Sequence, residues 1–280
     1  MKDTDTSLLS SLIASGAIDK TAAQPLTDKI DAYRALVQST RGMESGSMDL
    51  DTVAYVDMTI KADGETTSSK MTTVGSTQSI VNGSDIRMAV TSKVTADDGS
   101  TTESGSWLKD GWLYLSTTAG GETAKIKLAA GSDLAELEDL VQLPDQNVSG
   151  LAMVKSISTR RSGSDTVYTL VISQSSVNSL LDSTLSGMLD GMVDADGITT
   201  SSHASDVTGI YTVSSQGVLK ELRAAYSTTI HFSIPATADS PAQTMDMTCA
   251  YDTTITVKAT GSAVKVTYPD LSGFVEIDMG

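Results

Sequence analysis

The sequence has little of several residues on which disulfide-stabilised folds, enzymes and nucleic-acid-binding proteins depend. Its 280 residues include one cysteine, Cys249, so no disulfide can form within the chain. Histidine occurs twice, and aromatic residues make up 4%. Lys and Arg number 19 against 35 Asp and Glu, which gives a net charge of −16. Because phosphate binding needs clustered positive charge, this balance disfavours a nucleic-acid partner and electrostatic docking on an anionic membrane.

Long hydrophobic runs are also absent. A membrane-spanning helix needs about 18 or more consecutive apolar residues, and no such run occurs. Residues 1–6 lack the basic stretch leading into an apolar one that marks a signal peptide. The abundant Ser, Thr and β-branched residues nevertheless suit exposed strand faces and are typical of exported proteins. We therefore expect the mature part of an exported protein, whose signal sequence and lipid anchor lie outside these residues.

Catalytic and metal-binding motifs are missing too. There is no Gly-x-Ser-x-Gly, and the two histidines, His203 in a Ser-rich loop and His231 on the polar face of a strand, are expected to be ordinary surface residues. Residues 194–197 are similar to the middle of a calcium loop, but that register places Met192 and His203 where acidic ligands are needed. Cys249 falls on an apolar face and is expected to be an inert buried thiol. We expect no enzyme, no cofactor and no metal.

Helical spacing of apolar residues predicts two main helices, over residues 26–40 and 174–193. The first carries Leu26, Ile30, Tyr33 and Val37 in one stripe, and the second carries a wider stripe. A short helix is expected at 132–141. Residues 1–25 are expected to form a tether or a short helix, and residues 26–280 a single domain.

Alternation of apolar and polar residues with a period of two, typical of β-strands, is abundant in the sequence. From Met48 to Ile60 every second residue lies on a mainly apolar face, and the pattern recurs over residues 218–234 and 245–257. A final strand is expected at 263–268, and residues 194–206 are expected to be a loop. Tight-turn dipeptides separate the strands and make neighbours antiparallel: Asp63-Gly64, Asn82-Gly83, Asp98-Gly99, Asp110-Gly111, Gly120-Gly121 and Ser162-Gly163.

Long strands with one apolar face need cover, and long sheets twist and curl. We therefore predict an α+β fold that is mainly antiparallel β, with about eleven long strands curled into a half-open barrel and helices packed on its concave face. No βαβ alternation runs through the chain, which disfavours a doubly wound parallel sheet.

The stretch from Trp107 to Leu115, followed by Lys125 to Leu128, is similar to hairpins of the LolA-like group of cell-envelope proteins. This group contains the periplasmic lipoprotein carriers and the LppX/LprG-type lipid-binding lipoproteins. The order of elements over about residues 26–277 resembles theirs as well. The resemblance implies a cavity between sheet and helices that holds acyl chains. It also implies a location in the cell envelope, at the outer face of the cytoplasmic membrane, with attachment to the membrane through a lipid anchor.

The expected ligand is therefore a lipid or another hydrophobic molecule, held by inward-facing strand residues and by the second main helix. Flexible methionines in this set would adapt to a variable apolar content. The alternative is a structural or protein-interaction lipoprotein whose helices fill the barrel. An apolar cavity above about 300 Å³ would favour the carrier. The predicted lining comprises Met48, Val56, Met58, Met88, Val90, Leu185, Met188, Leu189, Met192, Tyr226, Ile230, Phe232, Met247 and Tyr251.

Overall fold

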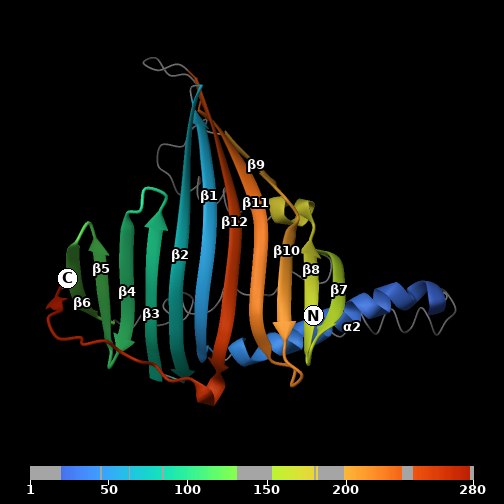
Figure 1. Cartoon of the computed structure of the whole chain (residues 1–280), viewed down its shortest axis with the longest axis horizontal. Helices are drawn as coiled ribbons and strands as arrows, with labels where there is room; N and C mark the ends of the chain where they lie inside the picture. The colour runs from blue at the N-terminus through green and yellow to red at the C-terminus, as the bar shows by residue number, and fades with distance from the viewer. Residues whose placement is uncertain are drawn as a thin grey trace.

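The computed structural model describes residues 20–44, 46–62, 64–83, 85–130, 153–179, 181, 199–234 and 242–277. Over these residues a long helix, α2 (Lys20–Glu44), lies against one large sheet (Figure 1). The strands are β1 (Met48–Ala62), β2 (Glu65–Asn82), β3 (Asp85–Ala96), β4 (Thr101–Lys109), β5 (Trp112–Ala119), β6 (Glu122–Ala129), β7 (Val154–Ser162), β8 (Asp165–Ile172), β9 (Thr199–Ala204), β10 (Val207–Val213), β11 (Leu219–Ile234), β12 (Gln243–Thr260) and β13 (Val275–Glu276).

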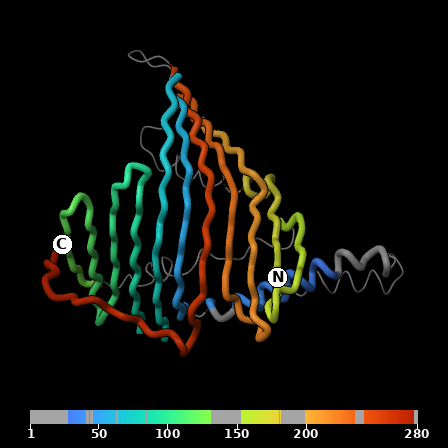
Figure 2. Tube along the Cα trace, in the orientation of Figure 1, coloured from blue at the N-terminus to red at the C-terminus, as the bar shows by residue number. Residues whose placement is uncertain are grey.

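The sheet runs in the order β13-β6-β5-β4-β3-β2-β1-β12-β11-β10-β8-β7, with β9 paired to β11. All pairs are antiparallel except that of β13 with β6. The trace in Figure 2 shows a curled sheet whose two ends do not meet. The predicted mainly antiparallel, curled and unclosed sheet is therefore confirmed, with thirteen strands in the described residues rather than about eleven.

The turns are where the dipeptides predict them. Asp110 and Gly111 have φ of 52° and 78°, and Gly120 and Gly121 have 60° and 85°. Positive φ at both central residues matches the right-handed twist of the flanking strands. The turn glycines of the other four predicted dipeptides also have positive φ.

Four strands at the centre of the sheet are unusually long. β1 has 15 residues, β2 and β12 have 18 each, and β11 has 16. Every residue of β1 is paired with β2, so the hairpin stays in register over its full length. In Figure 1 these strands rise above their neighbours to a common tip.

β9 and β10 run one after the other along β11, separated by a bulge. Residues 205–207 lie opposite Tyr226 and Ser227, so three residues face two. The Ser205 N–H donates to the Ser227 carbonyl at 2.8 Å, and the Ser227 N–H donates to Ser205 Oγ at 2.9 Å. The prediction of a loop over 194–206 is wrong for residues 199–204. Their Ser- and Thr-rich composition shows no apolar alternation, although their backbone pairs fully with β11.

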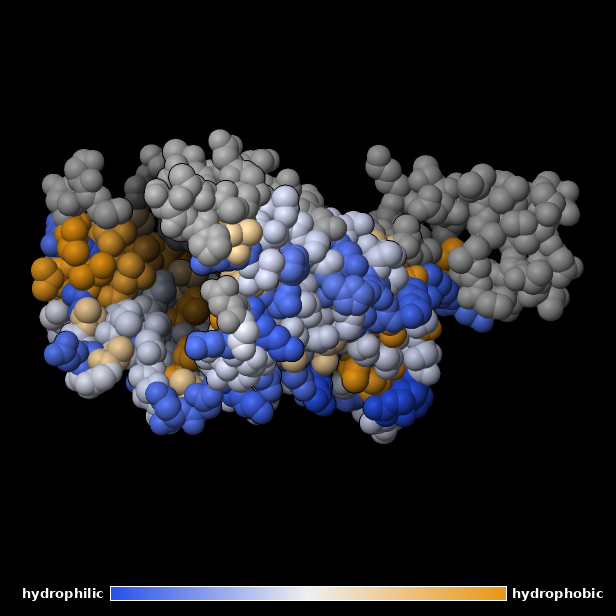
Figure 3. Space-filling model, turned by 90° about the horizontal axis from the view of Figure 1, so that it is seen from above, coloured by the Kyte–Doolittle hydropathy of each residue, from blue (hydrophilic) through white to orange (hydrophobic). Residues whose placement is uncertain are grey.

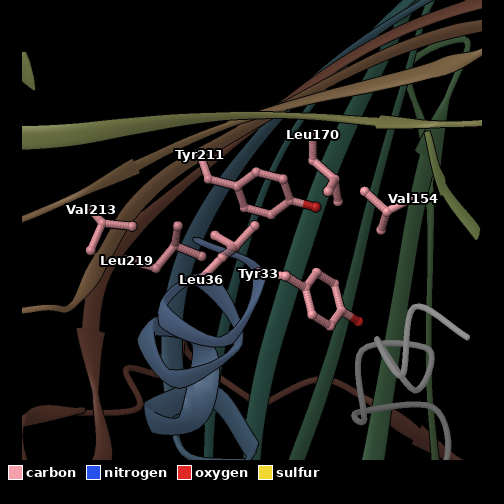
Figure 4. Close-up of a cluster of buried hydrophobic side chains, with 7 residues drawn as sticks. All are labelled: Tyr33, Leu36, Val154, Leu170, Tyr211, Val213 and Leu219. Atoms are coloured by element: carbon pink, nitrogen blue, oxygen red, sulfur yellow. The ribbon is translucent and has the colours of Figure 1, made fainter. Parts of the chain in front are cut away.

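α2 begins six residues before the predicted helix and continues to Glu44. Its Tyr33 and Leu36 are 5% and 4% exposed and lie in the main core cluster, which Figure 4 shows. The apolar stripe predicts that Val37 lies in the core. In the structure Leu36 is the buried residue of the cluster, and Val37 packs at its edge. The predicted helix at 132–141, residues 1–19 of the predicted N-terminal segment and residues 182–193 lie outside the described residues. Residues 174–179 and 181 are helical.

The chain after β12 does not form the strand predicted over 263–268. A 3₁₀ turn at Gly261–Ala263 redirects it, and residues 264–274 run along the lower edge of the sheet to β13 (Figure 1). The Thr267 N–H donates to Gln78 Oε1 at 2.9 Å, and the Tyr268 hydroxyl donates to the Leu108 carbonyl at 2.9 Å. Side-chain and backbone acceptors of the sheet thus take the place of a strand ladder. We call residues 264–277 the return segment.

Candidate functional site

Cross-strand pairing brings the apolar residues of three long strands onto one face. The rows that β1, β12 and β11 form towards the tip are Val56–Tyr251–Tyr226, Met58–Cys249–Thr228, Ile60–Met247–Ile230 and Ala62–Met245–Phe232. We call these residues the upper apolar face. Residues directly opposite in antiparallel pairs, and those two positions apart along a strand, point to the same side of the sheet. Seven of the predicted lining residues therefore lie side by side: Val56, Met58, Tyr226, Ile230, Phe232, Met247 and Tyr251.

Two stacked tyrosines form the lower row of this face. The rings of Tyr226 and Tyr251 have centroids 4.8 Å apart and an interplanar angle of 21°. Burial, with a smaller contribution from the Cys249 thiol, raises the pKa of Tyr251 to about 12. Burial also raises the pKa of Tyr226. Both phenols are therefore neutral at physiological pH, and the upper apolar face carries no ionised group.

Burial differs along this face. Cys249 and Thr228 are buried, whereas the other residues of the upper apolar face are half-buried. Cys249 thus has the buried position expected of it. The surrounding Met, Ile and Phe side chains have apolar area that the described part of the chain leaves partly accessible.

α2 covers a different part of the sheet. Its main sheet contacts are with β7 and β10, and its Tyr33 and Leu36 pack among apolar residues of β7, β8, β10 and β11 (Figure 4). The members of this cluster are Tyr33, Leu36, Val154, Leu170, Tyr211, Val213 and Leu219. Burial raises the pKa of Tyr33 and of Tyr211. The lower part of the sheet near β7 is therefore filled by the chain's own side chains.

The remaining predicted lining residues divide into two groups. Met48 and Met88 are 2% and 6% exposed and act as core residues near the lower ends of β1 and β3, where Val90 packs beside Met88 and Leu108. Ser79 is the cross-strand partner of both Met48 and Met88. It is fully buried between them and donates its hydroxyl to the Gly46 carbonyl at 2.5 Å. Leu185, Met188, Leu189 and Met192 lie outside the described residues.

The opposite, polar face contains a hollow that the sequence pattern did not indicate. It has a volume of about 300 Å³ and lies over β2 to β5, with Trp107 and Gly105 at one side and the Lys93–Glu103 ion pair at another. The indole ring of Trp107 lies directly on Gly105, where an added Cβ would meet Trp107 Cη2 at 1.9 Å. A glycine two residues before a tryptophan in a strand is the signal that could have located this feature.

The histidines lie on the surface, as expected. His231 Nδ1 is 2.6 Å from Asp246 Oδ1 on the polar face, and exposed His203 contacts the Gln174 amide. In the part of the chain that the structure describes, no three His, Cys, Asp or Glu side chains converge as a metal ion requires. None of the described helices combines the length and hydropathy of a membrane crossing.

Comparison with known proteins gives only distant similarity. No family model matches the chain, and no curated protein matches it. Among solved structures, a DUF1329 family protein from Desulfovibrio piger is 12% identical and covers 84% of this chain and 95% of its own, with a TM-score of 0.25. The ywiB protein from Bacillus subtilis is 10% identical over 75% and 96%, with a TM-score of 0.18.

A third solved structure belongs to the group that the sequence resembles. The LolA superfamily protein NE2245 from Nitrosomonas europaea is 10% identical to this chain and covers 83% of this chain and 96% of its own, with a TM-score of 0.20. The expected LolA-like group is thus represented among the structural neighbours, at a level of similarity that carries no argument about function.

Proposed function

We propose that this protein binds a lipid acyl chain, or a ligand of the same apolar chemistry, against the upper apolar face. The observation that supports this proposal is the contiguous, uncharged set of half-buried side chains on β1, β11 and β12, away from the main contacts of α2. Removal of this apolar area from water would drive binding, at about 25 cal/mol per Å² before the cost of ordering the ligand.

The chemistry of the face suits a flexible chain rather than a rigid polar molecule. Met58, Met245 and Met247 supply unbranched thioethers, which adapt to different contents. The neutral stacked pair Tyr226–Tyr251 supplies a flat base without ionised groups. We further propose that the protein acts in the cell envelope as a lipid-anchored carrier. Detection of the protein in a detergent-extractable envelope fraction of its own host would support this, and its recovery in the cytosol would contradict it.

Neighbouring positions on β11 allow a matched test of binding. Ile230 belongs to the upper apolar face, whereas Thr229 points to the polar face and shares a hydroxyl contact of 3.0 Å with Thr248. We expect Ile230→Asn to weaken binding of a fluorescent fatty acid by about tenfold or more, because about 1.4 kcal/mol of apolar contact corresponds to tenfold in Kd. Thr229→Asn should change the Kd by less than about twofold.

The assay is fluorescence titration of both variants and the unaltered chain, after folding is checked by circular dichroism. Native mass spectrometry of protein purified from its own host should detect a bound lipid. Equal binding by Ile230→Asn and Thr229→Asn would show that the ligand binds to another surface of the protein. No binding of any acyl probe, together with no lipid in the native spectrum, would contradict the proposal and favour a structural role.

A further inference from the structure

The edge of β6 is held by a very short strand. β13 pairs with Ile126 and Lys127 in the parallel direction, and the Ile277 N–H donates to the Lys127 carbonyl at 2.9 Å. Parallel pairing is slightly less stable per residue than antiparallel pairing. In the described residues the rest of the eight-residue β6 has only β5 beside it. An edge with unpaired backbone groups is a template for another strand.

On the polar face, two side chains of the return segment, Phe274 and Glu276, contact residues of β4, β5 and β6. Phe274 meets Trp107 edge-to-face with ring centroids 6.0 Å apart, and Tyr114 in the same way at 5.4 Å. Lys125 Nζ lies 5.5 Å from the centroid of the Phe274 ring. Two positions later, Glu276 forms an ion pair of 3.1 Å with Lys127. The site thus takes an aromatic ring followed by a carboxylate.

The other side of the same edge is apolar. Val275 pairs with Ile126 in the register, and Val275 and Ile277 are 65% and 41% exposed. These are among the exposed large hydrophobic residues of the described chain. Figure 3 shows hydrophobic residues gathered at the end of the sheet that carries β5 and β6. The return segment therefore occupies the edge while leaving Val275 and Ile277 exposed.

Charge also distinguishes this end of the molecule. The chain has a net charge of −16, yet Lys125 and Lys127 lie next to each other on the polar face of β6, where Lys127 Nζ is also 4.4 Å from the Trp112 ring centroid. An acidic partner would be repelled by most of this protein and attracted here.

We infer that the β6 edge is a docking site for an extended segment of a partner protein with the pattern aromatic–apolar–acidic–apolar, and that the return segment holds the site until the partner displaces it. The partner would add a strand to β6, place its aromatic ring between Trp107 and Tyr114, and pair its carboxylate with Lys127. Recognition of this kind combines backbone hydrogen bonds with alternate side-chain pockets.

Fluorescence anisotropy with a labelled peptide of residues 270–280 tests the inference on the full chain. Phe274→Ala in the chain removes the ring that anchors the return segment. This variant should bind the peptide at least tenfold more tightly than the unaltered chain. In the peptide, Phe274→Ala or Glu276→Lys should weaken binding to that variant at least tenfold. Ser272→Ala should change binding less than twofold, since the Ser272 hydroxyl bonds Asp270 within its own turn.

A charge exchange makes the test independent of the stability of one variant. Lys127→Glu in the chain should abolish binding of the unaltered peptide and restore binding of the Glu276→Lys peptide. Folded chains that bind no peptide, or that bind all peptides equally, would overturn the inference. Concentration-dependent dimers of the unaltered chain that Phe274→Ala abolishes would overturn the assignment to a partner, because a second copy of the chain would then supply the strand.

Discussion

At the scale of single residues, Gly105 and Trp107 set the surface of the polar face. The indole ring rests on the glycine, and the ring of Phe274 meets it edge-on. We expect Gly105→Ala to destabilise the protein by about 1–3 kcal/mol, because the new Cβ overlaps a ring that is 8% exposed. Urea unfolding measures the loss, and tryptophan fluorescence should shift as the ring moves. Ser104→Ala, at the neighbouring exposed position, should change stability by less than about 0.5 kcal/mol. Equal stability of both variants would show that the indole ring relocates freely.

Residue-level signals were strong at turns and weak at packing positions. Asp110-Gly111 is predictable because few residue pairs adopt positive φ at both positions. By contrast, Gly209 lies under the ring of Tyr211, where an added Cβ would be 2.7 Å from Tyr211 Cε2. As with Gly105 and Trp107, the local signal is a glycine two residues before an aromatic residue, but the burial of the Tyr211 ring in the core comes from distant neighbours.

At the scale of elements, α2 is held by a few apolar residues that pack against β7, β8, β10 and β11. Leu36 is 4% exposed in the main cluster. Leu36→Ala should lower the free energy of unfolding by about 2–5 kcal/mol, through lost burial and the cavity left behind. Gln38→Ala, at an exposed position of the same helix, is the matched control and should have an effect below about 0.5 kcal/mol. Chemical denaturation of both variants gives the comparison, and similar losses would mean that the α2 contacts do not stabilise the sheet.

Asp206 joins three elements at the bulge between β9 and β10. Its carboxylate accepts hydrogen bonds from Lys155 Nζ at 2.5 Å and from the Gln174 N–H at 2.9 Å, and the Lys155 contact is the main cause of its lowered pKa. Because the pKa is lower in the folded state, the ionised group stabilises the fold above its unfolded pKa. This stabilisation is lost as the pH falls through the folded pKa.

We therefore expect Asp206→Asn to be less stable than the unaltered chain at pH 7, with a difference that shrinks to near zero at acidic pH. Urea unfolding from pH 7 down to about pH 2, well below the ordinary aspartate pKa of about 3.9, measures this trend. Glu122→Gln, at an exposed position of β6, serves as the control. A stability difference that persists unchanged at the acidic end would rule out ionisation of Asp206 as its source.

Element prediction succeeded where apolar residues alternate and failed where backbone pairing alone defines a strand. The residues of β1, β11 and β12 show a period of two and are long strands in the structure. β9 has the sequence of a polar loop but pairs with β11, and residues 264–268 have apolar residues at every second position but follow a turn away from the ladder. Sequence reports which side chains a strand would bury, whereas pairing depends on distant neighbours.

At the scale of the whole molecule, the class of fold follows from composition and turn spacing, and the candidate site follows only in part. Val56, Tyr226 and Tyr251 could be placed on one face before the structure because their strands alternate regularly, and the register confirms their alignment. Met48 and Met88 are core residues on either side of buried Ser79, and periodicity alone does not specify that burial. Their role as a ligand lining stays a prediction.

The two ends of the open sheet differ in a way that bears on self-assembly. In the part of the chain that the structure describes, β7 ends the sheet on one side and presents exposed Lys155, Arg160 and Arg161, while β13 pairs with two residues of β6 on the other. A ribbon can polymerise by adding copies only if both of its ends can grow. Because β13 pairs with only Ile126 and Lys127, growth at the β6 end would first require β13 to be displaced. While β13 stays in place, association through β7 would stop at a closed pair rather than continue as a filament.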